Sequence, residues 1–400
     1  MIPSLQEFQS HTMTYAASLS LDPDLDSAVQ AVCADVRKQL AGQSPTLCFL
    51  FASHAHADGF DELPATIRRE LGAEVLLGCS GETVVGGLQE IEDGPALSLW
   101  AGVLPGATLT PFHVEFGETP DGLIAVGFPE DLSERAADAR ALFAFGEPYT
   151  SVPDSVIDRF ADELPGVPLL GGMASGGGPG ANRVFLNDDC LSDGTVAVLL
   201  QGGPKVRSVV SQGCRPIGPT FVVTKSERNI VFELGGKPTI NRLREFLSEL
   251  PERDQQLVQQ GLHLGIAMSE YKPTFGRGDF LIANVIGADQ QIGAIAIGNL
   301  VRVGQTVQFH IRDADTADED LAHLLDQHRA EQPAPTRGAL LFSCNGRGTR
   351  LFDAPHHDAN AIQKVLGRIP VAGFFAQGEL GPVGGKNYIH GFTASIACFE

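Results

Sequence analysis

Basic residues are scarce in this sequence. Lys and Arg together number 28, against 49 Asp and Glu, and the formal net charge is −21. A field of that sign repels phosphate groups, so we expect neither nucleic acid nor an anionic membrane surface as a partner. No apolar run approaches the roughly 20 residues that a membrane-spanning helix needs, and the first residues, MIPSLQEFQSH, do not resemble a signal peptide. The sequence therefore predicts a cytoplasmic protein without membrane insertion.

Metal and disulfide motifs are also missing. The seven Cys include no C-x-x-C pair, and most lie in apolar runs, which is typical of reduced, buried thiols. The histidine clusters, His54-x-His56 and His356-His357, lack the spacing of a zinc site, and Asp358 is interpreted as the N-cap of a helix that begins at Ala359. Glycine-rich runs such as GGMASGGGPG lack the Gly-Lys-Ser/Thr of a phosphate-binding loop. We expect no metal site.

What the sequence does contain is a repeat. Three short apolar runs are each followed by an amphipathic helix, a second strand that breaks at glycine, and a third apolar segment. The first strands are 47–53, 141–148 and 339–348; the glycine-containing segments are 73–82, 167–177 and 369–379; the third segments are 96–104, 195–202 and 393–399. Each unit therefore reads as strand, helix, strand, Gly-turn and strand.

The regions around the repeat complete the predicted fold. We expect a helix over 24–40, paired strands over 203–237, a helix near 240–250, a β-meander over 279–312, and a further helix at the acidic run that follows. The predicted fold class is α/β of mixed type: repeated strand–helix–strand–strand units form mixed twisted sheets with helices packed on them, in two pseudo-related domains. The predicted boundaries are an extension with the start of the first helix at 1–30, a first domain at 31–220 and a second at 221–400.

Several segments resemble the FIST family. GRGDFLIANVIGADQQIGAIAIGNLVRVGQTVQFHIRDA and SCNGRGTRLF…PVAGFFAQGELGPVGGKNYIHGFTASIACF resemble the C-terminal FIST domain, while LLGCSGE, LLGGMAS and GCRPIGP are similar to the N-terminal one. The resemblance implies an intracellular sensory, signal-transducing protein that binds a small ligand, with an amino acid the usual suggestion. It also implies haem-based nitric oxide sensing as an alternative. The sequence leaves no room for an output domain, so we expect a stand-alone protein with a separate downstream signalling partner.

The third unit is the most polar, and it is the predicted binding site. A strand–helix–strand crossover brings the loop after the first strand and the Gly-turn after the second to the same edge of the sheet. Arg347 is suited to bind a carboxylate and Glu379 an ammonium, as in a zwitterion such as an amino acid. The alternative is an Arg347–Glu379 salt bridge that only ties the two loops together. The predicted ligand-binding residues of this unit are Cys344, Asn345, Arg347, Gln377, Gly378, Glu379, Lys386 and Asn387.

The first unit offers a second set of candidates, Cys79, Ser80 and Glu82, and we take Glu82 as the equivalent of Glu379. A hydrolase-like enzyme with Cys344 or Cys79 as nucleophile is the competing hypothesis, although no cysteine-enzyme signature surrounds either residue. For haem, His54, His113 and His390 are the available axial ligands. The segment 269–280 is expected either to cap the pocket or to be a surface loop. A ligand-free scaffold that presents its surfaces to a partner is the third hypothesis.

Overall fold

The computed structural model describes residues 13–400 apart from 121, 273, 277 and 332–333. It confirms the repeat. In each unit the first two strands are parallel and the third pairs antiparallel with the first. The elements of the units, in order, are β2 (Leu47–Ser53), α2 (Leu63–Leu71), β3 (Val75–Gly81) and β6 (Leu97–Val103); β9 (Ala139–Gly146), α3 (Pro153–Glu163), β10 (Leu169–Met173) and β13 (Thr195–Gly202); and β22 (Gly338–Cys344), α7 (His357–Leu366), β23 (Val371–Ala376) and β26 (Ala394–Phe399).

A strand that precedes each unit extends its sheet on one side. The three strands are β1 (Thr14–Ser20), β7 (Ala107–Thr119) and β14 (Val206–Ser211). Each pairs with the third strand of its unit. The helices α1 (Leu25–Gln39) and α6 (Ala314–Glu331) precede the first and third units, and β8 (Gly122–Val126) pairs with β7. Short 3-10 turns lie at η1 (His54–Gly59), η2 (Ser133–Asp138) and η3 (Gly348–Arg350). The sequence predicted α1, whose N-cap is Asp24, but missed β1.

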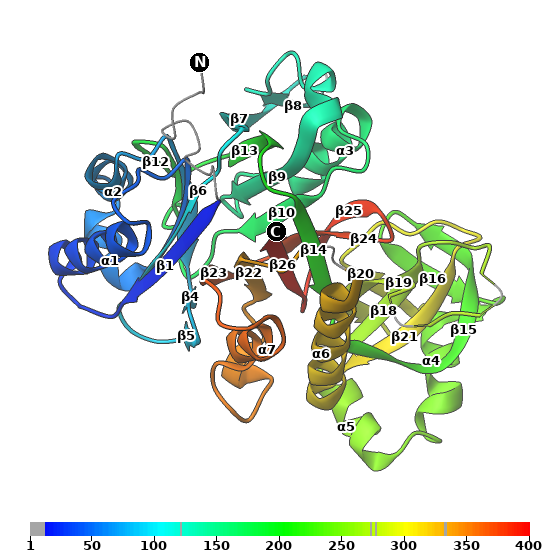
Figure 1. The fold of residues 1–400 in the computed structure, drawn as a ribbon. Helices are drawn as coiled ribbons and strands as arrows, with labels where there is room; N and C mark the ends of the chain where they lie inside the picture. Colours follow the sequence, from blue (N-terminus) through cyan, green and yellow to red (C-terminus); the bar gives the residue numbers. More distant parts are fainter. Residues whose placement is uncertain (1–12, 121, 273, 277, 332–333) are drawn as a thin grey trace, which may run out of the picture.

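On the other side, the units exchange hairpins in a cycle. The first unit's hairpin, β4 (Val84–Gly86) with β5 (Gln89–Ile91), pairs with β23 of the third. The third unit's hairpin, β24 (Glu379–Val383) with β25 (Lys386–His390), pairs with β10 of the second. The second unit's hairpin, β11 (Val184–Leu186) with β12 (Asp189–Leu191), pairs with β3 of the first. Each sheet is therefore completed by residues from another unit, and the three sheets meet at the centre of Figure 1.

Equivalent phenylalanines occupy this meeting point. Phe51, Phe145 and Phe342 hold the same position in the first strand of each unit, and all three are fully buried. The centroid of the Phe145 ring lies 5.5 Å from that of Phe51 and 5.6 Å from that of Phe342, in edge-on contacts. Strands buried on both faces read as continuous apolar runs, which explains why these strands were recognisable from sequence.

The first glycines of the predicted Gly-turns, at 78, 171 and 373, lie within strands β3, β10 and β23. A Cβ on Gly373 would lie 1.9 Å from the carbonyl oxygen of Leu341 on the paired strand β22, and Gly78 and Gly171 meet equivalent contacts at 1.9 and 2.0 Å. Placing these glycines in turns was therefore wrong: they permit a close approach of two parallel strands.

A barrel-like sheet is inserted between β14 and α6 and lies to the right in Figure 1. Its strands run in the order β15-β21-β18-β19-β20-β16-β17, and β15 also pairs with β16, which closes the sheet around a separate apolar core. The predicted helix near 240–250 is confirmed, whereas α5 and β18 were missed. Strands do form within 279–312, but the predicted meander is wrong, because β21 pairs with β15 and β18 while β20 pairs with β19 and β16. The elements are β15 (Cys214–Glu227), β16 (Ile230–Leu234), β17 (Lys237–Pro238), α4 (Thr239–Leu247), α5 (Glu252–Gln260), β18 (Leu262–Ala267), β19 (Phe280–Asp289), β20 (Ala294–Ile297) and β21 (Thr306–Arg312).

Candidate functional site

A crevice lies where the third unit meets the barrel. Its volume is about 370 Å³, and we call it the Cys344 crevice. Cys344 and Asn345 come from the loop after β22, while Gln377, Gly378 and Glu379 come from the turn after β23 and the start of β24. The crossover thus brings together five of the residues that sequence reasoning selected. The wall opposite them is formed by Ile282, Ala283, Asn284, Gly298 and Asn299 of the barrel and by 389–392.

Glu379 is a fully buried carboxyl group in this wall. Its Oε2 accepts a hydrogen bond from the Thr393 N–H at 3.0 Å, while its Oε1 is buried without a hydrogen-bond partner among the described residues. A buried polar oxygen without a partner costs free energy, so it requires a reason.

The strand register identifies what is unusual about Glu379. It pairs opposite Gly172, and the same position in the other two exchanged hairpins is occupied by Val84 and Val184, both fully buried. Glu82 is not the equivalent of Glu379, as the sequence comparison had it, because Glu82 lies before β4. Of the three exchanged hairpins, the third therefore carries a carboxyl where the repeat places an apolar side chain.

Burial sets the protonation of both acidic groups in the crevice. It raises the pKa of Glu379 to about 8, against the opposing effects of the Thr393 N–H, the Cys344 thiol and nearby arginines. Burial also raises the pKa of Cys344 to about 12, with the charge of Glu379 adding to the effect. At neutral pH the crevice therefore holds a neutral thiol and a largely protonated carboxyl, not a thiolate.

Arg347 lies behind the crevice and does not line it. Its guanidinium donates from Nε and Nη2 to the two carboxylate oxygens of Asp358, at 2.7 and 2.8 Å, and both side chains are fully buried. Burial alone would raise the pKa of Asp358, but Arg347 holds it below its usual range. The N-cap interpretation of Asp358 is wrong: the N-cap of α7 is His356, and Asp358 points inward to the arginine and to the Ser343 hydroxyl. The salt bridge that Arg347 forms is therefore with Asp358 and not with Glu379.

A second arginine beside the crevice was missed. The guanidinium carbon of Arg312, at the end of β21, lies 4.7 Å from the centroid of the Phe392 ring, and Phe392 lines the crevice. Arg312 donates from Nη2 to the carbonyl of Gly346, and its Nε is buried without a hydrogen-bond partner in the described part of the chain. It comes from the barrel, which lies outside the repeat, so no sequence signal placed it beside Glu379.

The remaining predicted residues lie elsewhere. Lys386 is exposed on the exchanged hairpin, and Asn387 uses its amide to bond the backbone of Val167 and Leu169. Cys79 packs in the central core, where burial raises its pKa well above the ordinary value. The Ser80 hydroxyl accepts from the Arg183 N–H, and Glu82 forms an ion pair with Arg350. The first-unit candidates Cys79, Ser80 and Glu82 therefore do not line the Cys344 crevice.

The three candidate axial histidines use their Nε2 atoms within the protein. The Nε2 atoms of His54, His113 and His390 each lie 2.9–3.1 Å from a backbone carbonyl oxygen, and axial coordination through Nε2 would break that bond. Among the described residues, no three His, Cys, Asp or Glu side chains gather closely enough to hold a metal ion.

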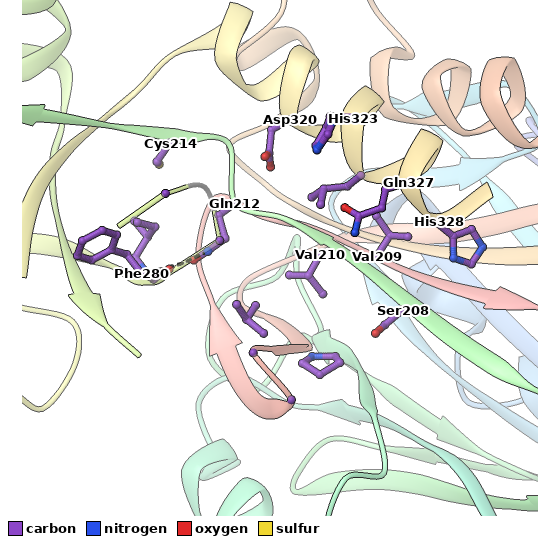
Figure 2. A pocket seen from close by; sticks show the side chains of 18 of the residues that line it. Ser208, Val209, Val210, Gln212, Cys214, Phe280, Asp320, His323, Gln327 and His328 are labelled. Carbon is purple, nitrogen blue, oxygen red and sulfur yellow. Dashed lines mark hydrogen bonds between the residues drawn. The ribbon is translucent and has the colours of Figure 1, made fainter. Parts of the chain in front are cut away.

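A larger groove of about 820 Å³ is lined by the tip of the exchanged hairpin, whereas the crevice is lined by its base. Figure 2 shows β14 running along it, with His323, Gln327 and His328 of α6 on one side. Phe275, Gly276 and Phe280 line this groove, so the described part of the segment 269–280 lies at the groove and does not cap the Cys344 crevice. Residues 273 and 277 of that segment lie outside the described residues.

None of the described helices combines the length and the apolar character that crossing a bilayer would require.

Comparison with known proteins supplies the family. The model of the FIST N domain matches residues 46–237, and that of the FIST C domain matches 240–382. A protein of Mycobacterium tuberculosis (strain ATCC 25618 / H37Rv), described as uncharacterized, is 42% identical over 388 residues, which are 97% of this chain and 100% of that protein. An uncharacterized protein of Mycobacterium bovis (strain ATCC BAA-935 / AF2122/97) is 40% identical over 388 residues, which are 97% of this chain and 99% of that protein.

Proposed function

The chain belongs to the FIST family, whose domains are associated with sensory signal transduction, and we propose that it senses a small metabolite bearing an amino group, bound in the Cys344 crevice. The observation that carries the proposal is Glu379, a buried carboxyl with one oxygen unpartnered among the described residues, where the other two hairpins have valine. An ammonium that donates to Oε1 would satisfy that oxygen and would favour the ionised carboxylate.

The polar groups around Glu379 indicate the rest of the ligand. The Asn345 Oδ1 is a second buried acceptor with no partner in the described structure, and it also suits an N–H donor. Amide side chains of Asn284, Asn299 and Gln377 supply donors at the crevice wall. None of the described Lys or Arg side chains lines the crevice, and Arg347 is paired with Asp358. The carboxylate of an amino acid would therefore be held by neutral donors.

The hydrolase alternative receives no support from the thiols. A cysteine nucleophile reacts as the thiolate, and burial raises the pKa of both Cys344 and Cys79. We therefore favour binding over catalysis, with a separate signalling protein receiving the output.

A thermal-shift screen tests the proposal. The panel contains amino acids, the corresponding primary amines, and N-acetylated amino acids of the same side chains. We expect at least one amino acid or amine to raise the melting temperature with the logarithm of its concentration, and its N-acetylated form to have no effect, since acetylation removes the ammonium.

The matched control is Glu379→Gln, which keeps the size of the side chain but cannot ionise. The shift should disappear in this variant. A panel without any shift contradicts the proposal, and a shift that persists in Glu379→Gln places the ligand outside the Cys344 crevice.

A further inference from the structure

The larger groove follows an open strand edge. β14 is the last strand of its sheet and pairs with β26 alone among the described strands. Val206, Arg207, Ser208, Val209 and Val210, consecutive residues of β14, all line the groove. An exposed edge of this kind presents unpaired backbone groups and is a template for another strand.

The register shows which backbone groups face outward. The backbone carbonyl of Lys205 accepts from the Glu400 N–H at 3.0 Å, and Val206 lies opposite Phe399. Hydrogen-bonded pairs alternate along an antiparallel ladder, so Arg207 and Val209 bond to β26. The N–H and C=O groups of Val206, Ser208 and Val210 therefore point to the open edge.

The two walls of the groove differ in chemistry. On one side α6 contributes Asp320 and Glu331 together with His323 and Gln327. Asp320 and Glu331 are the α6 carboxylates that line the groove, so this wall carries negative charge. The lining arginines, 207 and 215, are both held in ion pairs with carboxylates.

On the other side the wall is apolar. It is formed by Val167 and Pro168 of the second unit and by Pro382 and Val383 near the end of β24. A strand lying between the two walls would alternate its side chains, one toward α6 and the next toward the prolines.

We propose that this groove binds an extended peptide segment of a partner protein, which adds to β14 as a further antiparallel or parallel strand and alternates basic with apolar residues. Backbone hydrogen bonds to Val206, Ser208 and Val210 supply affinity, and the two walls select the side chains. β14 has six residues, which corresponds to about 20 Å of extended chain, so the bound core is about six residues long.

The proposal concerns a site separate from the Cys344 crevice, but one hairpin contributes to both. Glu379 and Ile389 of β24 and β25 line the crevice, while Pro382 and Val383 line the groove. Ile282 of β19 lines both as well. A peptide in the groove therefore rests on the element that carries the crevice carboxyl.

The test is a selection from a displayed library of random decapeptides on the intact protein, followed by fluorescence polarisation with the enriched peptides. Ser208→Pro removes one outward N–H without breaking a bond to β26, because proline is tolerated at an open edge. Ser208→Ala is the matched control, since it keeps the N–H. We expect Ser208→Pro to weaken binding at least about fivefold and Ser208→Ala to leave it unchanged.

A second arm uses the wild-type protein, so that it does not depend on the folding of a variant. The enriched peptides are N-methylated at alternate residues, in each of the two phases. Strand addition predicts that only one phase abolishes binding. The proposal is overturned if no basic–apolar peptide is enriched, or if binding withstands both Ser208→Pro and N-methylation in either phase.

Discussion

Glu379 gives the protein a measurable dependence on pH. Its pKa is about 8 in the folded protein against an ordinary value of 4.5, so between these values the folded state holds a proton that the unfolded chain has released. The contribution of Glu379 to the free energy of unfolding is therefore full below about pH 4.5 and is lost as the pH rises toward 8.

We expect the melting temperature of the wild type, relative to that of Glu379→Gln, to fall between pH 5 and pH 8. Calorimetric scans of both proteins across this range measure it. Glu90, whose pKa burial also raises to about 8, is present in both proteins and cancels in the difference. A difference that is constant with pH would contradict the assignment.

The pair Arg347–Asp358 is predicted to be structural. Replacing Asp358 with Asn leaves a buried guanidinium without its counter-charge, and breaking such a pair costs about 3–5 kcal/mol. Urea unfolding should therefore show a loss of that order. Asp326→Asn is the control, because the Asp326–Arg329 pair is exposed and its loss should cost less than about 1 kcal/mol. Equal losses in the two variants would show that the buried pair does not contribute the predicted stability.

Residue roles were only partly predictable. The repeat was sufficient to bring Cys344 and Glu379 to one place, because crossover geometry fixes which loops meet. The repeat did not predict the direction in which Arg347 points. Arg347 is held by Asp358, and from sequence Asp358 was interpreted as a helix N-cap instead. The equivalence of Glu82 and Glu379 failed because it matched Gly81-Glu82 to Gly378-Glu379. Strand register shows that the residue equivalent to Glu379 is Val84, which lies as far along the chain from Gly78 as Glu379 lies from Gly373.

At the scale of elements, the parallel strand pairs depend on a glycine. Gly373→Ala would place a methyl group against the Leu341 carbonyl, and forcing β22 and β23 apart should cost about 1–3 kcal/mol or more. Thermal unfolding measures the loss. Gly178→Ala is the control, because no described atom lies within 4 Å of the position that its Cβ would take, and its φ is not positive. A Gly373→Ala variant as stable as Gly178→Ala would refute the close approach of the two strands as the reason for the glycine.

The strands and helices of the three units were predictable from their apolar runs and helical spacing. The exchange of hairpins was not. Their strands are short, with only three residues in β4 and in β11. The sequence of such a short segment does not indicate which sheet it joins. Pairing between units depends on how whole sheets pack around the central phenylalanines. The pattern of residues within one short segment does not predict this packing.

At the scale of the whole molecule, the cyclic exchange makes the units interdependent. Residues 1–212 alone would lack the hairpin β24–β25 that completes the second sheet, and would also lack Phe342 and Phe374 of the central core. We expect this fragment to show no cooperative thermal transition, and co-expression with 213–400 to restore one. A fragment 1–212 that unfolds cooperatively at the temperature of the full chain would contradict this view.

The central claim is that an ammonium group binds the carboxylate of Glu379. Binding must then displace the proton that this group holds below pH 8. Isothermal titration calorimetry at pH 6, 7 and 8, with the amino acid or amine that gives the largest thermal shift, measures this directly. The account predicts proton release and an affinity that rises with pH, by up to about tenfold per unit, in the wild type but not in Glu379→Gln. An affinity independent of pH, without proton release, would contradict it.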